Sequence, residues 1–325
     1  MPANALQSYN TVGAREDLED MIYMTSPTDT PFISSIDRTT CDATYHEWQR
    51  DTLRAPASNA QVEGFDATYN AQTQPERIGN RTQIISDTLS VTGTTEAIRK
   101  AGRKNNSEVS RLAGKKMIEL KKDVEYAAIS NPVAVVGSTS IPRQMRGLFG
   151  WIATNSQSGS GGAAPNPSTN TAPTVGTLRP ENEAFTKTAL LQAYSTGGDV
   201  DMIMVSPTHK QLYSAFTGNV TRFSDIGGDK SNANSTLNTA YTFYGSDFGT
   251  VKVVPNRVMA ASGAGTANTD YFIDTSKWAL ATLTGRGFHK EELAKVGDAE
   301  NYLILTEVTL VAREERASAA VRDIQ

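Results

Sequence analysis

The sequence of 325 residues contains a single cysteine, Cys41. One thiol cannot form an intramolecular disulfide or a cysteine-based zinc cluster, so disulfide-stabilised and zinc-ribbon proteins are excluded. No signature of a cysteine enzyme surrounds this residue, and an isolated thiol usually packs as a small apolar group. We therefore predict that Cys41 is buried and has no catalytic role.

Long hydrophobic stretches are also missing. No run approaches the roughly 18 apolar residues that a bilayer-spanning helix needs. The first residues, MPANALQSYNTVGARED, lack the basic and apolar regions of a secretory signal. We expect a soluble globular protein that makes no membrane contact and stays where it is made.

The chain has no excess of positive charge. It carries 31 Lys and Arg against 35 Asp and Glu, which gives a formal net charge of -4. Proteins that hold nucleic acid tightly neutralise many phosphates with clustered basic side chains. The sequence predicts at most weak, non-specific contact with nucleic acid.

Catalytic motifs are absent as well. His46, His209 and His289 lie far apart in the sequence. None of them belongs to an HxxxH or HExxH pattern, which would place two metal ligands on one helix face. The GxSxG motif of serine hydrolases does not occur either.

Glycine-rich segments and acidic positions do not supply a site. Residues 159–164, GSGGAA, and the stretch from Gly263 lack the preceding strand and the Lys-Ser/Thr ending of a phosphate-binding loop. Asp225, Asp229 and Asp247 do not match the spacing of a calcium loop. We therefore predict no catalytic, cofactor-binding or metal-binding residues, and a protein that is not an enzyme.

What the sequence does contain is a long segment, from Cys41 to Ile98, that is rich in strand-forming and turn residues. The large apolar side chains between Glu47 and Thr82 are Trp48, Leu53, Val62, Phe65, Tyr69 and Ile78. Burial of so few side chains cannot offset the entropy of ordering about three dozen residues. We predict an extended arm that is ordered by other copies of the chain.

Within this arm, residues 44–48 predict an outgoing strand and residues 81–95 a return strand. In the return strand Ile85, Leu89 and Val91 fall on one face, and serine and threonine residues fall on the other. The alternation predicts a strand with one solvated face.

A long amphipathic helix is predicted over residues 107–131. Its stripe of residues spaced by three and four consists of Val109, Leu112, Ala113, Lys116, Leu120, Val124 and Ala127, widened by Met117 and Ala128. Asn106 or Ser107 is the expected cap, and Asn131 before a proline is the expected end.

The N-terminal part predicts a short helix over residues 14–24. Prolines at 27 and 31 then make a rigid turn. The apolar residues that follow, Phe32, Ile33 and Ile36, are expected to anchor this segment to a core.

Residues 155–180 are rich in Gly, Ser, Asn, Thr and Pro and predict an exposed, flexible loop or linker between lobes. The pattern after this loop is α/β. The predicted elements are a helix over 183–194, a strand over 202–205, a helix over 207–216, a hairpin over 241–259, a glycine-rich loop over 261–268, and strands over 271–273, 278–282 and 302–312. The tail, residues 313–324, is expected to close the first lobe.

This order of parts resembles the Hong Kong 97 phage fold of tailed-phage major capsid proteins. The segments that carry the resemblance are SPTDTPFISSI at 26–36, YHEWQRDTL at 45–53, IELKKDVEYA at 118–127, MVSPTHKQLYSAF at 204–216 and YGSDFGTVKVVPNRVM at 244–259. The resemblance covers nearly the whole chain. It is specific because all five segments occur, and in the same order along the chain.

The resemblance implies an α+β fold in five parts. These are an N-terminal arm at 1–40, an extended β-hairpin loop with its return strand at 41–98, a peripheral domain at 99–180 with the spine helix 107–131 and the flexible loop 155–180, an axial α/β domain at 181–295, and a C-terminal strand and tail at 296–325 that return to the peripheral domain.

The function implied by the resemblance is structural. Copies of the chain would self-assemble as hexamers and pentamers into the icosahedral head of a double-stranded DNA tailed phage, in the virion capsid, with assembly in the host cytoplasm. The implied partners are other copies of the chain, a portal protein, a separate scaffolding protein and, as an option, a decoration protein.

Two departures from relatives bear on mechanism. Some relatives cross-link the extended loop through a Lys-to-Asn isopeptide bond, but this chain has no lysine before Lys100. Some carry a long N-terminal scaffolding segment, whereas this sequence enters the arm almost at once. We expect non-covalent loop contacts and a separate scaffolding protein. The net negative charge also suits the inner wall of a shell, because packaged DNA must move past that wall.

Two alternatives stay open at this point. A bacterial nanocompartment shell of the same fold, which encloses enzymes, has a similar sequence texture. A small-molecule hydrolase with an α/β core at 183–295 would have its site near Ser206 and His209. The Ser206-Pro207 pair is already explained as a helix start, which makes the hydrolase the weaker alternative.

Overall fold

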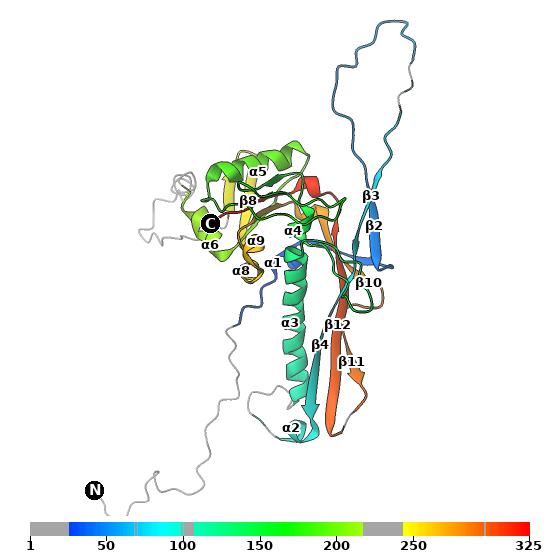
Figure 1. Ribbon diagram of the computed structural model, residues 1–325, viewed down its shortest axis with the longest axis vertical. Helices are drawn as coiled ribbons and strands as arrows, with labels where there is room; N and C mark the ends of the chain where they lie inside the picture. The colour runs from blue at the N-terminus through cyan, green and yellow to red at the C-terminus, as the bar shows by residue number, and fades with distance from the viewer. Residues whose placement is uncertain are drawn as a thin grey trace, which may run out of the picture.

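A computed structural model describes residues 26–67, 69, 71–98, 100, 107–216, 243–295 and 297–325. The helix predicted over 14–24 lies outside these residues. The described chain forms two adjoining lobes, and a long hairpin arm projects away from both of them (Figure 1). The helix α3 runs the length of one lobe beside its sheet.

The first lobe is built on a sheet with the strand order β1-β10-β12-β11, in which β4 also pairs with β12. Its strands are β1 Asp37–Cys41, β4 Gln83–Thr92, β10 Trp278–Leu283, β11 His289–Leu293 and β12 Ala299–Ala312. The long strand β12 pairs antiparallel with β4, β10 and β11, so it is the centre of this sheet. The short helices α2 Gly93–Ala97 and α4 Leu148–Trp151 pack against α3 in the same lobe.

Helix α3, Glu108–Ser130, confirms the predicted long helix to within one residue at each end. The Ser107 hydroxyl accepts a hydrogen bond from the Ser110 amide at 3.2 Å, and Asn131 follows the last helical residue. The apolar stripe is buried over the C-terminal half of the helix. Met117 is 37% exposed, so the prediction that it widens the stripe was wrong.

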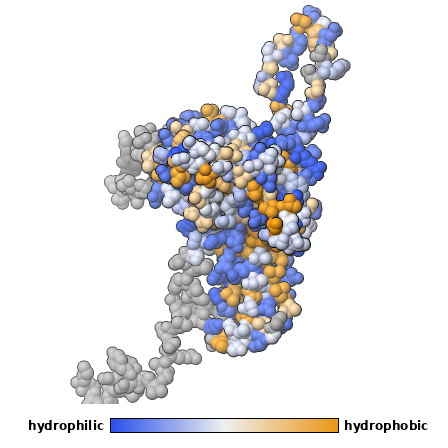
Figure 2. Space-filling view, viewed as in Figure 1, coloured by the Kyte–Doolittle hydropathy of each residue, from blue (hydrophilic) through white to orange (hydrophobic). Residues whose placement is uncertain are grey.

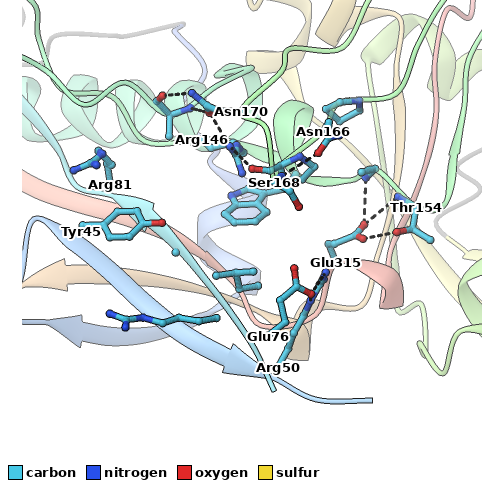
Figure 3. A pocket seen from close by; sticks show the side chains of 18 of the residues that line it. Tyr45, Arg50, Glu76, Arg81, Arg146, Thr154, Asn166, Ser168, Asn170 and Glu315 are labelled. Atoms are coloured by element: carbon cyan, nitrogen blue, oxygen red, sulfur yellow. Dashed lines mark hydrogen bonds and ion pairs between the residues drawn. The ribbon is translucent and has the colours of Figure 1, made fainter. Parts of the chain in front are cut away.

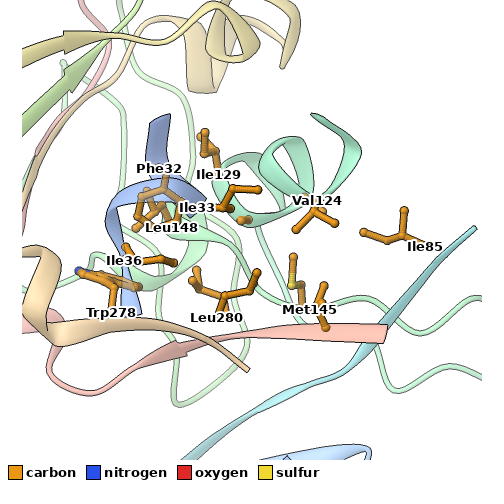
Figure 4. Close-up of a cluster of buried hydrophobic side chains, with 14 of the residues drawn as sticks. Phe32, Ile33, Ile36, Ile85, Val124, Ile129, Met145, Leu148, Trp278 and Leu280 are labelled. Atoms are coloured by element: carbon orange, nitrogen blue, oxygen red, sulfur yellow. The ribbon is translucent and has the colours of Figure 1, made fainter. Parts of the chain in front are cut away.

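The core of the first lobe includes the segment that the sequence predicted to be an anchor. Helix α1, Pro31–Ser35, and the residue after it bury Phe32, Ile33 and Ile36. These side chains lie against Trp278 and Leu280 of β10 (Figure 4). The anchoring prediction is confirmed, and each of the three burials is worth ~2 kcal/mol of transfer free energy.

The second lobe is built on a sheet with the strand order β5-β13-β9-β6-β8-β7. Its strands are β5 Ser156–Gln157, β6 Met202–Val205, β7 Phe243–Ser246, β8 Gly249–Pro255, β9 Asp270–Ile273 and β13 Ala319–Val321. Its helices are α5 Glu183–Ser195, α6 Pro207–Ser214, α8 Arg257–Ala261 and α9 Ala264–Ala267, and short 3-10 turns lie at Thr275–Lys277 and Glu315–Ala317. The predicted helices, strands and hairpin of this region are confirmed, whereas the predicted glycine-rich loop contains α9.

The C-terminal tail differs from its prediction. It was expected to close the first lobe, but β13 pairs with β9 and with β5 in the sheet of the second lobe. The three residues of β13 are small and apolar and are fully buried. Their pattern identifies a buried strand but carries no information about which sheet receives it.

The arm is also paired differently from the prediction. Strand β2, Tyr45–Arg50, pairs antiparallel with β3, Glu76–Arg81. The predicted return strand over 81–95 is instead β4, which belongs to the core sheet and is separated from β3 by Thr82 alone. The predicted alternation within β4 is confirmed, because alternation reports the buried face of a strand and not its partner.

The segment 155–180 is mostly exposed, as predicted, but it is not a free linker. Isolated bridges join Ala163 to Thr174 and Asn166 to Thr171. The Asp323 carboxylate accepts a hydrogen bond of 2.8 Å from the Gly159 amide. The low-complexity composition did not predict these contacts, because backbone groups make them.

Candidate functional site

Among the residues that the structure describes, the most exposed large apolar side chains lie on the arm. Between β2 and β3 the exposed fractions are 100% for Leu53, 77% for Val62, 53% for Phe65 and 99% for Tyr69. Figure 2 shows hydrophobic residues at the tip of the arm, well away from the body. A segment that extends so far without burying its apolar side chains on its own subunit is typical of a surface that binds a partner.

The arm leaves the body from a fixed base. The Trp48 indole donates a hydrogen bond of 2.8 Å from Nε1 to the carbonyl oxygen of Ala312. Its ring centroid lies 5.7 Å from that of Trp151, in a tilted arrangement. These contacts join β2 to the end of the central strand β12 and to α4.

Asn80 fixes the other strand of the arm. Its side chain is fully buried. Nδ2 donates to the carbonyl oxygens of Arg146 at 3.0 Å and Leu310 at 2.7 Å, and Oδ1 accepts from the Arg146 amide at 2.9 Å. One side chain therefore satisfies backbone groups from two other segments.

The junction between β3 and β4 is held by a buried carboxylate. The Thr82 hydroxyl donates to Glu307 at 2.6 Å, and the guanidinium groups of Arg143 and Arg286 form ion pairs with the same carboxylate at 2.5 and 2.9 Å. Glu307 is only 2% exposed. The residue that separates the arm from the core sheet is thus fixed in position.

An open cleft of about 790 Å³ lies beside the base of the arm (Figure 3). The Arg146 guanidinium lies over the Trp151 ring at 4.7 Å and donates to the Asn170 side chain at 2.7 Å. Burial lowers the pKa of Arg146. Arg50 on the other wall pairs with Glu76 at 2.7 Å. These two arginines of the cleft therefore already have partners.

A second apolar surface, the body patch, consists of Ile84, Val136 and Ile141. Their exposed fractions are 50%, 66% and 54%. They line a shallow groove of about 430 Å³ together with Pro142 and Arg143. Figure 2 shows hydrophobic residues on the body below the arm as well as on the arm itself.

The hydrolase alternative placed its site near Ser206 and His209. The Ser206 hydroxyl caps α6 by accepting from the His209 amide at 3.3 Å, and it also contacts the Thr208 hydroxyl at 2.9 Å. The His209 ring lies 2.6 Å from the Asp270 carboxylate, a partner that the sequence did not reveal. Ser206, His209 and Asp270 are at most 2% exposed, so a substrate cannot reach them.

The other chemically capable residues lie apart. The His46 ring packs beside Trp48 in the arm base, and the His289 ring contacts the Gly287 carbonyl at 2.6 Å. Cys41 is 2% exposed, which confirms the predicted buried thiol. Burial raises the pKa of the Cys41 thiol to about 11, with a smaller contribution from Glu307.

Within the described ranges, no group of three or more His, Cys, Asp or Glu side chains is placed to hold a metal ion. The helices of these same ranges include none that is long and apolar enough to cross a membrane. The exposed apolar surfaces are therefore the features that point to a function.

Residues 2–325 match the model of a family described as SU10 major capsid protein. A curated relative, the major capsid protein of Escherichia phage Phieco32, is 27% identical over 356 aligned residues, which cover 97% of this chain and 95% of that protein.

Solved structures share the fold. The chain superposes on a chain from the cyanophage A-1(L) capsid asymmetric unit with a TM-score of 0.65 and 15% identity, covering 96% of this chain and 97% of that one. It also superposes on the holo-SrpI encapsulin complex from Synechococcus elongatus with a TM-score of 0.59 and 10% identity, covering 99% and 97%. At these identities the structures indicate a common fold only.

Proposed function

Since the chain belongs to the SU10 major capsid protein family, we propose that its copies are joined in a phage head by non-covalent docking of the exposed arm. The predicted fold of the Hong Kong 97 type and the predicted role as a structural major capsid protein are confirmed. Many copies of the chain form a shell, and the protein is located in the virion capsid. The nanocompartment alternative has only a shared fold in its favour.

One observation supports the docking proposal above all: Leu53 and Tyr69 are almost completely exposed on an arm that is rigidly attached at its base. Transfer of such side chains from water into a contact contributes ~1.5–3 kcal/mol each. The body patch of Ile84, Val136 and Ile141 offers a matching apolar surface. The arm of one subunit binds this patch on a neighbour.

The contact is non-covalent, because the chain has no lysine before Lys100 to form an isopeptide bond from the arm. Binding energy therefore comes from buried apolar area and backbone hydrogen bonds, summed over many identical contacts in a closed shell. The copies are arranged as hexamers and pentamers in an icosahedral head.

Assembly occurs in the host cytoplasm with a separate scaffolding protein, a portal protein and, as an option, a decoration protein. Contact with packaged DNA is weak because the chain carries a formal net charge of -4. The protein has no enzymatic activity.

The proposed division comprises an N-terminal arm at 1–40, the extended loop at 41–98, the peripheral domain at 99–180, the axial domain at 181–295 and the C-terminal part from 296. The strands β10 and β11 lie within 181–295 but pair with β12 in the sheet of the first lobe.

Electron microscopy of the protein co-expressed with its phage partners tests the proposal. The variant Leu53→Ser/Val62→Ser removes apolar surface from the arm, and the matched control Leu53→Met/Val62→Ile retains it. We expect closed shells from the wild type and the control, and at least a tenfold lower yield of shells from the serine variant.

Two results would contradict parts of this proposal. Shells formed at wild-type yield by the serine variant would show that the arm side chains do not join the subunits. A wild-type protein that stays monomeric with and without its partners would contradict shell formation itself.

A further inference from the structure

Two carboxyl groups of the second lobe are linked through the hydroxyl groups of Thr186 and Tyr213. Asp270 of β9 is completely buried, and Glu181 lies just before α5. Glu181 Oε1 is 3.5 Å from the Thr186 hydroxyl, which lies 3.2 Å from the Tyr213 hydroxyl on α6. The phenol of Tyr213 in turn interacts with the Asp270 carboxylate.

The same two groups each keep one oxygen without a partner. Glu181 Oε2 and Asp270 Oδ2 are shielded from solvent and make no hydrogen bond within the described part of the chain. A buried carboxylate oxygen without a donor is costly when the group is charged, and much less so when it carries a proton. A proton retained on Glu181 avoids this cost.

The surrounding charges do not neutralise both acids. His209 of α6 contacts Asp270 at 2.6 Å. Arg179, the cation nearest Glu181 in sequence, directs its guanidinium to the carbonyl oxygens of Gln157 at 2.9 Å and Arg322 at 3.3 Å. That guanidinium also lies 4.1 Å above the Phe185 ring.

Other charged and titratable groups lie on β9, on α5 and in the tail after β13. Arg322 of the C-terminal tail is held by Ser156 and by the carbonyl oxygens of Phe149 and Ile152, and it lies near the buried Tyr271. Asp323 is adjacent to Arg179 and adds negative charge. Glu183 points to the Tyr244 hydroxyl at 3.1 Å.

We propose that Glu181 and Asp270 form a buried proton-binding site, in which one retained proton holds the start of α5 against α6 and β9. Glu181 is the group that takes up and releases this proton. When the proton is lost, a second negative charge appears beside Asp270, and the start of α5 is pushed away from the sheet. The inference does not depend on shell assembly.

The direction of the pH effect follows from the environment of Glu181. Burial, followed by the charge of Asp270, raises the pKa of Glu181 to about 8, whereas Arg179 opposes the rise. The folded protein then holds a proton that the unfolded chain releases near pH 4.5. This contribution to stability is complete below about pH 4.5 and is lost as the pH rises through about 8.

Equilibrium unfolding of the unassembled, full-length subunit between pH 5 and 9 tests the site. In the wild type, release of the Glu181 proton on unfolding should raise the unfolding equilibrium constant by up to about tenfold per pH unit. The variant Glu181→Gln should lack that component, and the control Glu291→Gln, at an exposed position on β11, should keep it. Identical pH slopes in all three proteins would overturn the proposal.

A second measurement covers the case in which Glu181→Gln does not fold. Amide exchange of the wild type, corrected for the intrinsic pH dependence of exchange, should show loss of protection in α5 between pH 6 and 9. Protection in α3 serves as the internal control. A parallel change in α5 and α3, or no change in α5, would refute the proton-binding site.

Discussion

Asn256 donates a hydrogen bond of 2.7 Å from Nδ2 to Oε1 of Glu125 on the long helix α3. The same carboxylate accepts hydrogen bonds from the backbone amides of Phe32 at 2.9 Å and Ile33 at 2.8 Å. Glu125 is fully buried, and this burial raises the pKa of its carboxyl group. One side chain therefore joins the N-terminal helix α1, the helix α3 and the second lobe.

Replacement of Glu125 by alanine should be strongly destabilising. Three buried donors would lose their acceptor, at ~1–3 kcal/mol each, so we expect the free energy of unfolding to fall by at least ~3 kcal/mol. Urea denaturation of the unassembled subunit measures this change.

The control for Glu125 is Glu119→Ala on the same helix. Glu119 is partly exposed and pairs with Lys115 and Lys116 on the helix surface, so the change should stay within ~0.5 kcal/mol. Equal effects of the two substitutions would contradict the role of Glu125 as a junction.

The substitution Asn80→Ala tests the base of the arm. It would leave the buried carbonyl of Leu310 and backbone groups of Arg146 without partners, at a cost of ~2–4 kcal/mol. Asn59→Ala, at an exposed position on the arm, should be neutral. A stable Asn80→Ala protein, with the melting temperature of the wild type, would show that the arm base is held by other contacts.

Two glycines should respond to alanine in opposite directions. At Gly114, on the exposed face of α3, an added Cβ meets nothing within 4 Å, so Gly114→Ala should stabilise the protein by ~0.8–1 kcal/mol. At Gly150 the added Cβ would lie 2.1 Å from the Pro132 carbonyl oxygen, so Gly150→Ala should destabilise it by ~1–3 kcal/mol. Thermal unfolding of both variants would distinguish these outcomes by sign.

The arm should change its exchange behaviour on assembly. Residues 50–80 carry exposed apolar side chains and, between β2 and β3, form no strand in the described residues. Their amides should exchange faster in unassembled subunits than in shells, because a neighbour covers them only in the shell. Hydrogen exchange followed by mass spectrometry measures this, and equal protection in both states would count against the proposed docking.

Much of the local structure was predictable because local patterns determine it. The long helix α3 follows from the spacing of its apolar residues and from the Ser107 cap, and α6 follows from the Ser206-Pro207 start. The exposure of Leu53 and Tyr69 follows from the shortage of apolar residues around them.

The pairing of strands was not predictable in the same way. The strand β4 was recognised as half-buried but was assigned to the arm. The tail was expected to close the first lobe, whereas its strand β13 pairs in the sheet of the second lobe. A strand pattern reports which face is buried, and the partner is chosen by contacts far away in the sequence.

The buried polar junctions were missed for the same reason. Glu125 lies 131 residues from Asn256, and His209 lies 61 residues from Asp270. On the sequence alone Glu125 belongs to a run of charged helix residues, and nothing there separates it from its solvated neighbours.

Because the chain is synthesised from its N-terminus, the late positions of β12 and β13 determine when the two lobes can fold. Strand β12 is the centre of one sheet, and β13 lies between β5 and β9 in the other. A nascent chain that has not yet extended past Ala312 lacks part of β12 and all of β13, so neither sheet is complete. Partly translated chains therefore lack a folded surface for association. Subunits can associate only after nearly all of the sequence has been translated.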